Sequence, residues 1–148
     1  LDQIVWAVNP ANDSLRSLTV YLRHITEEIF RSSAINCRLD IDKALPNVIL
    51  TSEARHNLCL SVREALNNSA KHSHATELWL RIHGQDKTLE IIVEDNGCGF
   101  AEMQAGTMGN GLVNMKQRME KIGGNFECRS QPGSGTACRM TLPLNIAL

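Results

Sequence analysis

The stretch TELWLRIHGQDKTLEIIVE, residues 76–94, decides the fold class of this 148-residue chain. Apolar and polar residues alternate on both sides of the run GQDK at 84–87, which predicts two antiparallel strands joined by a short turn. Two more alternating segments, at 125–130 and 136–142, predict a second hairpin. Hairpins do not fit the strict strand–helix alternation of a doubly wound parallel sheet. The pattern therefore favours an α+β fold, with helices layered on one face of a mixed sheet.

Helical periodicity marks the segments outside these hairpins, where apolar residues recur every three or four positions. Asn12 or Asp13 can cap the first helix, and Thr51 or Ser52 can cap the second. In chain order, the predicted elements are a helix at 15–32, a strand at 37–41, a helix at 52–72, the hairpin at 76–94, a helix at 112–122, and strands at 125–130 and 136–142.

Composition excludes several classes of protein. A hydrophobic fraction of 43% with 21% charged residues is too apolar for a disordered chain, and 148 residues match the size of one domain. The net charge of −1 offers no basic field for nucleic acid, and no uncharged run approaches the length of a membrane span. The five cysteines include no CxxC pair, which is typical of small apolar residues in a reducing cytoplasm.

The helix at 52–72 carries one polar stripe. At 100° per residue, Glu64, Asn68 and Lys71 fall within an arc of about 60°, opposite the apolar side of the helix. Amide and carboxylate oxygens suit Mg²⁺, and a lysine ammonium suits phosphate oxygens. An ordinary solvated helix face has the same pattern, so the stripe alone leaves both interpretations open.

Glycine-containing segments follow the hairpin at 76–94. Asp95 ends a strand just before glycines at 97 and 99, where a carboxylate can accept from an amino group and bare backbone lets a flat ligand approach. The glycines at 109 and 111 precede a helix, and a helix N-terminus can bind an anion. Ordinary turns explain each segment on its own. The region 96–111, however, is too long for a mere connector, which favours a functional loop.

The order and spacing of these segments resemble the motifs of the GHKL ATPases, the superfamily of histidine kinases, gyrase and mismatch-repair ATPases. REALNNSAKHSHA at 63–75 is similar to the N box, and VEDNGCGF at 93–100 to the G1 box. GNGLVNMKQRMEKIGG at 109–124 is similar to the G2 box, and GSGT at 133–136 to the final glycine-threonine motif. The chain is most like sensor histidine kinases whose dimerisation domain is of the nitrate-sensor type. The resemblance implies a two-layer α/β sandwich, the Bergerat-type fold, that binds ATP and Mg²⁺.

The resemblance assigns the polar stripe to the metal and the phosphates. Asn68 would ligate Mg²⁺, and Glu64 would orient the metal and its water. Lys71 and His72 would contact phosphate oxygens. Glu64, Asn68 and Lys71 would therefore carry the catalytic role, with Asn68 as the metal ligand.

The resemblance assigns the glycine-containing segments to the nucleotide. Asp95 would accept a hydrogen bond from the adenine amino group, and Thr136 would support it through a water. The other nucleotide contacts that it implies are Gly97 and Gly99, which let the adenine pocket close, Gly109 and Gly111, whose N–H groups bind phosphate, Leu112, and a lid at 101–110.

The resemblance also implies partners. The domain would give the γ-phosphate of ATP to a histidine of a separate dimerisation domain, for relay to an aspartate of a response regulator. Residues 1–10 would be the end of the dimerisation-domain helix and the join, and 11–148 the catalytic domain. We expect a cytoplasmic domain of a homodimeric parent, in a family whose members are often membrane-anchored, and we expect this chain to be a monomer.

Two alternative functions stay open. An anti-sigma-factor serine kinase is a GHKL domain of similar length, and a non-catalytic nucleotide-binding module could keep the fold with a degenerate site. WAVNP at 6–10 argues against the first because it is similar to the join to a dimerisation domain, and the intact motifs argue against the second. His24 is the nearest acceptor candidate and lies in no acceptor-like context, so we expect the chain to bind ATP without phosphorylating itself.

Overall fold

The computed structural model describes residues 6–7, 9–99 and 110–144. In chain order, its elements are η1 (Pro10–Asn12), α2 (Leu15–Phe30), β1 (Asn36–Ile41), α3 (Ser52–His72), β2 (Glu77–Gln85), β3 (Thr88–Asp95), α4 (Gly111–Lys121), β4 (Asn125–Ser130) and β5 (Thr136–Pro143). Every predicted helix and strand is present, with boundaries that differ from the prediction by a residue or two, as is usual for helix and strand ends.

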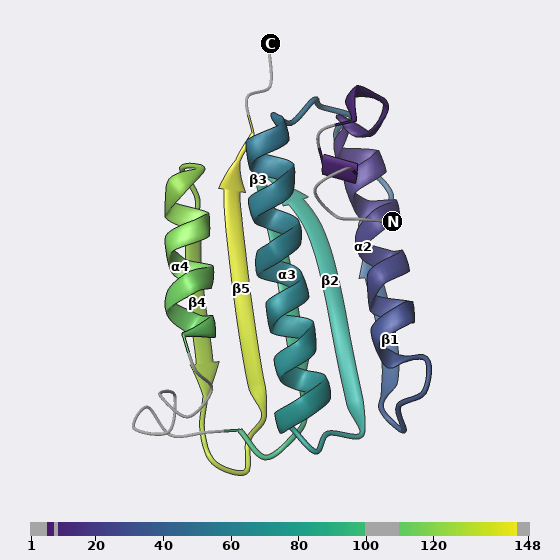
Figure 1. The fold of residues 1–148 in the computed structure, drawn as a ribbon, viewed down its shortest axis with the longest axis vertical. Coiled ribbons are helices and arrows are strands. Elements are labelled where there is room, and N and C mark those ends of the chain that lie inside the picture. The colour runs from purple at the N-terminus through teal and green to yellow at the C-terminus, as the bar shows by residue number, and fades with distance from the viewer. Residues whose placement is uncertain (1–5, 8, 100–109, 145–148) are drawn as a thin grey trace.

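The strands form one mixed sheet in the order β1-β2-β3-β5-β4. β1 pairs with β2 in parallel, and the other neighbours pair antiparallel. The helices α2, α3 and α4 lie side by side on one face of this sheet (Figure 1). The predicted two-layer α+β sandwich is therefore confirmed.

In the central hairpin, the apolar residues of the alternating pattern are the ones that are buried. In β2, Leu78, Leu80 and Ile82 have no exposed surface, and they face the helices. The residues between them point to the other face, where the Arg81 guanidinium pairs with the Glu94 carboxylate of β3. A slip of one residue in this register would move the apolar set out of the core, so the hydrophobic pattern fixes the pairing.

The capping residue of α2 differs from the prediction. Ser14, rather than Asn12 or Asp13, caps this helix, and its hydroxyl accepts a hydrogen bond from the Ser17 N–H at 3.1 Å. The short 3₁₀ helix η1 takes up residues 10–12 and ends at Asp13, so neither Asn12 nor Asp13 is free to cap α2. Thr51 caps α3, as one of the two predicted candidates, and accepts from the Ala54 N–H at 3.1 Å.

The described residues near the N-terminus pack against the helical layer. Trp6 stacks on Tyr21 of α2 with a centroid distance of 4.3 Å, and the buried Arg55 of α3 donates to the Ala7 carbonyl. Among the described residues, no helix combines the length and the apolar character needed to cross a membrane. These contacts tie the segment before α2 to the same core as the sheet.

One end of the molecule collects the segments that carry the predicted site. α3 ends at His72, β3 ends at Asp95 and α4 begins at Gly111. All three of these points lie at the lower end of the view in Figure 1. Residues far apart in sequence therefore meet at one edge of the two layers.

Candidate nucleotide site

Asp95, the last residue of β3, is the most deeply buried acidic group of the predicted site. Its side chain is only 4% exposed. Oδ2 accepts a hydrogen bond from the Ser69 hydroxyl of α3 at 2.7 Å, and Oδ1 accepts from the Gly97 N–H at 2.9 Å. A carboxylate has about four lone-pair sites, so these two bonds fix its orientation and leave acceptor capacity for a third donor.

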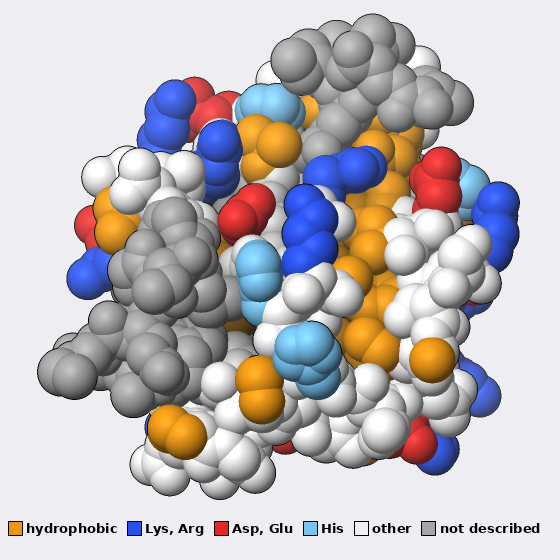
Figure 2. Space-filling model, turned by 60° about the horizontal axis from the view of Figure 1, so that its bottom comes forward, with side chains coloured by type: hydrophobic (Ala, Val, Ile, Leu, Met, Phe, Trp, Pro, Cys, Tyr) orange, Lys and Arg blue, Asp and Glu red, His pale blue; other side chains and the backbone are white. Residues whose placement is uncertain are grey.

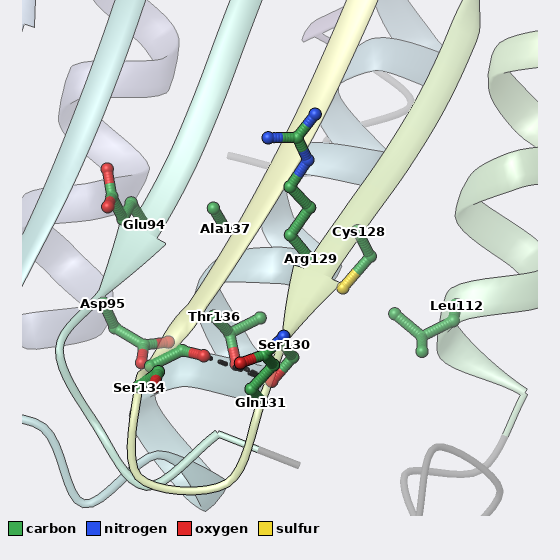
Figure 3. A pocket seen from close by; sticks show the side chains of 11 residues that line it. Glu94, Asp95, Leu112, Cys128, Arg129, Ser130, Gln131, Ser134, Thr136 and Ala137 are labelled. Atoms are coloured by element: carbon green, nitrogen blue, oxygen red, sulfur yellow. Dashed lines mark hydrogen bonds between the residues drawn. The ribbon is translucent and has the colours of Figure 1, made fainter. Parts of the chain in front are cut away.

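Asp95 faces a cavity of about 580 Å³ (Figure 3). Thr136 of β5 is its direct partner in the sheet register and also lines the cavity. The Thr136 hydroxyl lies 2.8 Å from the Ser130 hydroxyl. The full lining consists of Glu94, Asp95, Leu112, Cys128, Arg129, Ser130, Gln131, Ser134, Gly135, Thr136 and Ala137. A mixed wall with one oriented carboxylate matches the usual character of a small-molecule site.

Glycines hold the loop after β3 close to its neighbours. A Cβ at Gly97 would lie 2.1 Å from the Ser73 carbonyl oxygen, and one at Gly99 would lie 2.1 Å from the Gln131 carbonyl oxygen. Gly99 also has a positive φ of 62°, which side chains disfavour. In this structure the two glycines allow the close approach of backbone segments beside the cavity.

The polar stripe of α3 lies at the same end of the molecule. Glu64 and Asn68 are half-buried, whereas Lys71 and His72 in the last turn are exposed. Figure 2, which looks toward this end, shows histidine and basic side chains gathered beside acidic ones. Asn68, Lys71 and His72 do not line the cavity next to Asp95. The stripe can therefore meet a ligand only where the ligand extends beyond that cavity.

Glu64 reaches the first residue of α4. An ideal Cβ on Gly111 would lie 2.4 Å from Glu64 Oε1, so the carboxylate packs against the start of that helix. Asn110 precedes α4 and makes no side-chain capping bond. The first N–H groups of a helix have no partner within the helix, and they favour a negatively charged ligand.

Gly109 and most of the predicted lid, residues 101–109, lie outside the described residues. Within the described part of the chain, no group of three or more His, Cys, Asp or Glu side chains is arranged to hold a metal ion. Asn68, the predicted metal ligand, lies on α3 with Glu64 one helical turn before it.

Sequence analysis missed two serines of the site. Ser69 donates to Asp95, and Ser130 contacts Thr136. A signal for Ser69 exists in the sequence, because helical spacing puts it on the same side of α3 as the apolar Ala65 and Val62. A hydroxyl on a packing face needs a buried acceptor, and a strand-end carboxylate is one.

One thiol, that of Cys128, lines the cavity, and a second thiol, that of Cys138, lies buried beside it. Cys128 and Cys138 are register partners, and their sulfurs are 3.8 Å apart. The Cys138 thiol donates to the Cys128 sulfur, which lowers the pKa of Cys128. The same bond, together with burial, raises the pKa of Cys138.

Comparison with known families identifies a match over most of the chain. The family described as histidine kinase-, DNA gyrase B-, and HSP90-like ATPase matches residues 54–146. This segment contains all the described site residues from Glu64 to Thr136.

Several curated relatives are sensor proteins. The nitrate/nitrite sensor protein NarX of Escherichia coli K12 is 28% identical over 152 aligned residues, which cover 95% of this chain and 25% of NarX. The sensor histidine kinase YhcY of Bacillus subtilis is 37% identical over 97 residues, or 65% of this chain and 26% of YhcY. The chain thus spans about a quarter of the length of these relatives.

A solved structure shares the fold. The histidine kinase domain of the Erythrobacter litoralis EL346 blue-light activated histidine kinase superposes with a TM-score of 0.72 at 26% identity. The match covers 86% of this chain and 61% of that domain. Both the sheet and the helical layer therefore have a counterpart in a known kinase domain.

Proposed function

We propose, because this chain belongs to the histidine kinase-, DNA gyrase B- and HSP90-like ATPase family, that it is the ATP-binding catalytic domain of a sensor histidine kinase. It would supply the γ-phosphate of ATP to a histidine of a dimerisation domain, which passes it to an aspartate of a response regulator. Curated relatives that are sensor histidine kinases support this role over that of an anti-sigma-factor serine kinase.

The observation that carries the proposal is the environment of Asp95. Its carboxylate is buried, is oriented by Ser69 and Gly97, and faces a cavity with Thr136 on the neighbouring strand. A buried carboxylate gains a strong, charge-assisted hydrogen bond from an amino group that enters such a cavity. The adenine amino group is a donor of that kind, and the Thr136 hydroxyl can contact the base through a water.

The phosphates would extend from this cavity toward the start of α4. Gly111 and Leu112 would offer their backbone N–H groups there, and Leu112 also lines the cavity. Lys71 and His72, both exposed at the end of α3, would contact phosphate oxygens as cations or donors. We also assign Gly109 to the phosphates from the resemblance.

The oxygen atoms of Asn68 and Glu64 suit Mg²⁺, which does not need a site built entirely from protein ligands. Mg²⁺ usually takes one or two protein oxygens and completes its shell with water and substrate phosphates. Asn68 would provide one amide oxygen, and Glu64, one turn earlier on α3 and packed against the start of α4, would orient the surrounding water. When bound, the metal would neutralise phosphate charge.

Catalysis in such a site is positioning and charge neutralisation. Phosphoryl transfer needs the attacking and leaving oxygens or nitrogens in line with phosphorus, and little covalent chemistry is left to the protein. Asp95 would fix the base, and the start of α4 and Lys71 would hold the phosphates. The acceptor imidazole would come from the dimerisation domain.

The placement of this domain in its parent is part of the proposal. Residues 1–10 would be the end of the dimerisation-domain helix and the join, and residues 11–148 the catalytic domain. The parent would be a homodimer with this domain in the cytoplasm, and the isolated chain would be a monomer. The packing of Trp6 on Tyr21 supports a join that rests against the catalytic domain.

Exchange of Asp95 tests the proposal. We expect Asp95→Asn to weaken binding of a non-hydrolysable ATP analogue about ten- to a hundredfold, because hydrogen bonds to charged groups contribute about 1.5–3 kcal/mol. Binding of the GTP analogue should fall less. Calorimetric titration measures both affinities, and the NMR spectrum confirms that the variant is folded.

Glu90→Gln is the matched control, since Glu90 lies on the same strand but pairs with Arg139 away from the cavity. This variant should bind the ATP analogue as the unchanged chain does. Equal losses of affinity for the ATP and GTP analogues in folded Asp95→Asn would contradict the assigned role of Asp95.

A further inference from the structure

The cysteine pair of the β4–β5 hairpin has the placement of a disulfide that is not yet formed. Cys128 and Cys138 lie directly opposite each other, and their sulfurs are 3.8 Å apart. A disulfide bond is about 2.05 Å long, so closure requires a shift of less than about 2 Å. β4 is the edge strand next to β5, with a partner on one side only, and an edge strand can make such a shift.

The two thiols differ in their access to reagents. Cys138 is 5% exposed and packs in the core between the sheet and the helices. Cys128 is half-buried and lines the cavity from the end of β4 (Figure 3). A small reagent in the cavity therefore meets the Cys128 sulfur first and the Cys138 sulfur only through it.

We propose that Cys128 and Cys138 form a redox-modification site in the cavity wall, at which a hydroperoxide oxidises Cys128 and Cys138 closes a disulfide. The Cys128 thiolate attacks one oxygen of hydrogen peroxide, which yields a sulfenic acid and releases hydroxide. The Cys138 thiol then attacks that sulfur, and water leaves. In total, two thiols lose two hydrogen atoms, and one hydrogen peroxide becomes two waters.

The hydrogen bond between the thiols supports this order of events. The thiolate is the nucleophile in such reactions, and it is the Cys128 sulfur that accepts the bond. That bond lowers the pKa of Cys128, and the same bond, together with burial, raises the pKa of Cys138. The roles of attacked and resolving thiol thus follow from the position of each cysteine.

Nucleotide occupancy should control the reaction, a step that rests on the proposed function. A ligand in the cavity beside Asp95 would cover Cys128, because both residues line the same space. At a nucleotide concentration ten times its Kd, only about one chain in eleven has a free site, so oxidation should slow about elevenfold.

Peroxide treatment of the chain, followed by alkylation and peptide mass mapping, tests the proposal. We expect a Cys128–Cys138 disulfide that dithiothreitol reverses, and sulfenic acid trapped on Cys128 in Cys138→Ser. Cys37→Ser is the matched control, since Cys37 is also half-buried but lies on β1 at the opposite edge of the sheet. This variant should form the bond at an unchanged rate.

Two results would overturn the proposal: peroxide leaves Cys128 and Cys138 open to alkylation, or either one pairs with a different cysteine. Calorimetry of the reduced chain with ADP separates this test from the proposed function. If ADP binds but does not slow the oxidation, access through the cavity is wrong. If ADP does not bind, the proposed function fails, and the bond is judged by mass mapping alone.

Discussion

Asp95 and Asn68 have different environments although both are assigned to one ligand. Asp95 is buried and fixed by two hydrogen bonds, whereas Asn68 is half-buried on the polar side of α3. Because Ser69 bonds to Asp95, the residue next to Asn68 is anchored to the carboxylate that we assign to the base. In the proposed site the base contact would therefore be preorganised, and the metal contact would form on an accessible helix face.

Replacement of Asn68 should remove the magnesium-dependent part of nucleotide affinity. Mg²⁺ should increase the affinity of the unchanged chain for the ATP analogue. In Asn68→Ala we expect this increase to be at least about tenfold smaller, which is the lower end of the effect of substitutions around a metal site. Calorimetric titration with an ATP analogue, with and without Mg²⁺, measures this gain.

Asn67→Ala is the matched control for that measurement. Asn67 is the preceding residue of the same helix and lines a small hollow between α3 and α4. We expect it to keep the magnesium effect. A folded Asn68→Ala chain with an unchanged magnesium effect would refute the metal role.

The turn between β4 and β5, beside the cavity, contains two glycines with different surroundings. Gly133 and Gly135 have nearly the same φ, 79° and 78°. A Cβ at Gly135 would lie 2.1 Å from the Asp95 carbonyl oxygen, whereas one at Gly133 would meet nothing within 4 Å. A side chain at either position would therefore strain the backbone, but only one at Gly135 would also clash with a neighbouring atom.

Alanine substitution in this turn should reveal that difference. We expect Gly133→Ala to lower the free energy of unfolding by about 1–2 kcal/mol, the cost of a left-handed conformation. Gly135→Ala should cost clearly more, because β5 must move away from Asp95, and it should also weaken nucleotide binding. Urea denaturation measures the stabilities, and equal losses in the two variants would show that the contact at Gly135 is unimportant.

The central helix α3 carries a pH-sensitive group in its buried face. Cys59 has no exposed surface, and burial raises the pKa of its thiol from 9.0 to about 12. Between these values the unfolded chain loses a proton that the folded chain keeps. Folding stability from this group is therefore complete below pH 9 and is lost as pH rises toward 12.

Alkaline denaturation should detect this loss. We expect Cys59 to contribute a fall of about 1.4 kcal/mol per pH unit in the free energy of unfolding above pH 9. Other groups also titrate there, so the quantity to compare is the slope for the unchanged chain against that for Cys59→Ala. Identical slopes would mean that the Cys59 thiol ionises as easily in the folded state.

At the scale of the whole molecule, α3 lies between α2 and α4, which begins at the proposed nucleotide site. α2 contacts β1 at one edge, and α4 contacts β4 at the other. His24 lies exposed on α2, 3.6 Å from Glu28, and lines a separate hollow near Trp6. A phosphate held at the start of α4 is therefore remote from this histidine.

The chain should accordingly bind ATP without phosphorylating itself. Incubation with radiolabelled ATP should leave no acid-labile label, because no histidine of the described residues lines the cavity. Acid and base stability of any label distinguishes phosphohistidine from phosphoserine. Acid-labile label on His24 would contradict the prediction, and acid-stable label on a partner protein would favour a serine kinase.

Local patterns in the sequence determine most of the fold. Period-two alternation in β2 and β3 and helical spacing in α2, α3 and α4 depend only on neighbouring residues, so these elements lie where the sequence predicts them. The predicted cap of α2 was wrong because several residues before Leu15 can all cap a helix. Only the packing of η1 selects Ser14.

The sequence alone also identifies the candidate nucleotide-binding residues, since the motif glycines, Asp95 and the polar stripe of α3 can all be recognised in it. The tertiary structure alone decides which of them meet. Ser69 reaches Asp95 across 26 residues, and Glu64 touches Gly111. These pairs depend on how α3 and α4 lie over the sheet, and that arrangement follows from burial of the whole apolar surface rather than from any local run of residues.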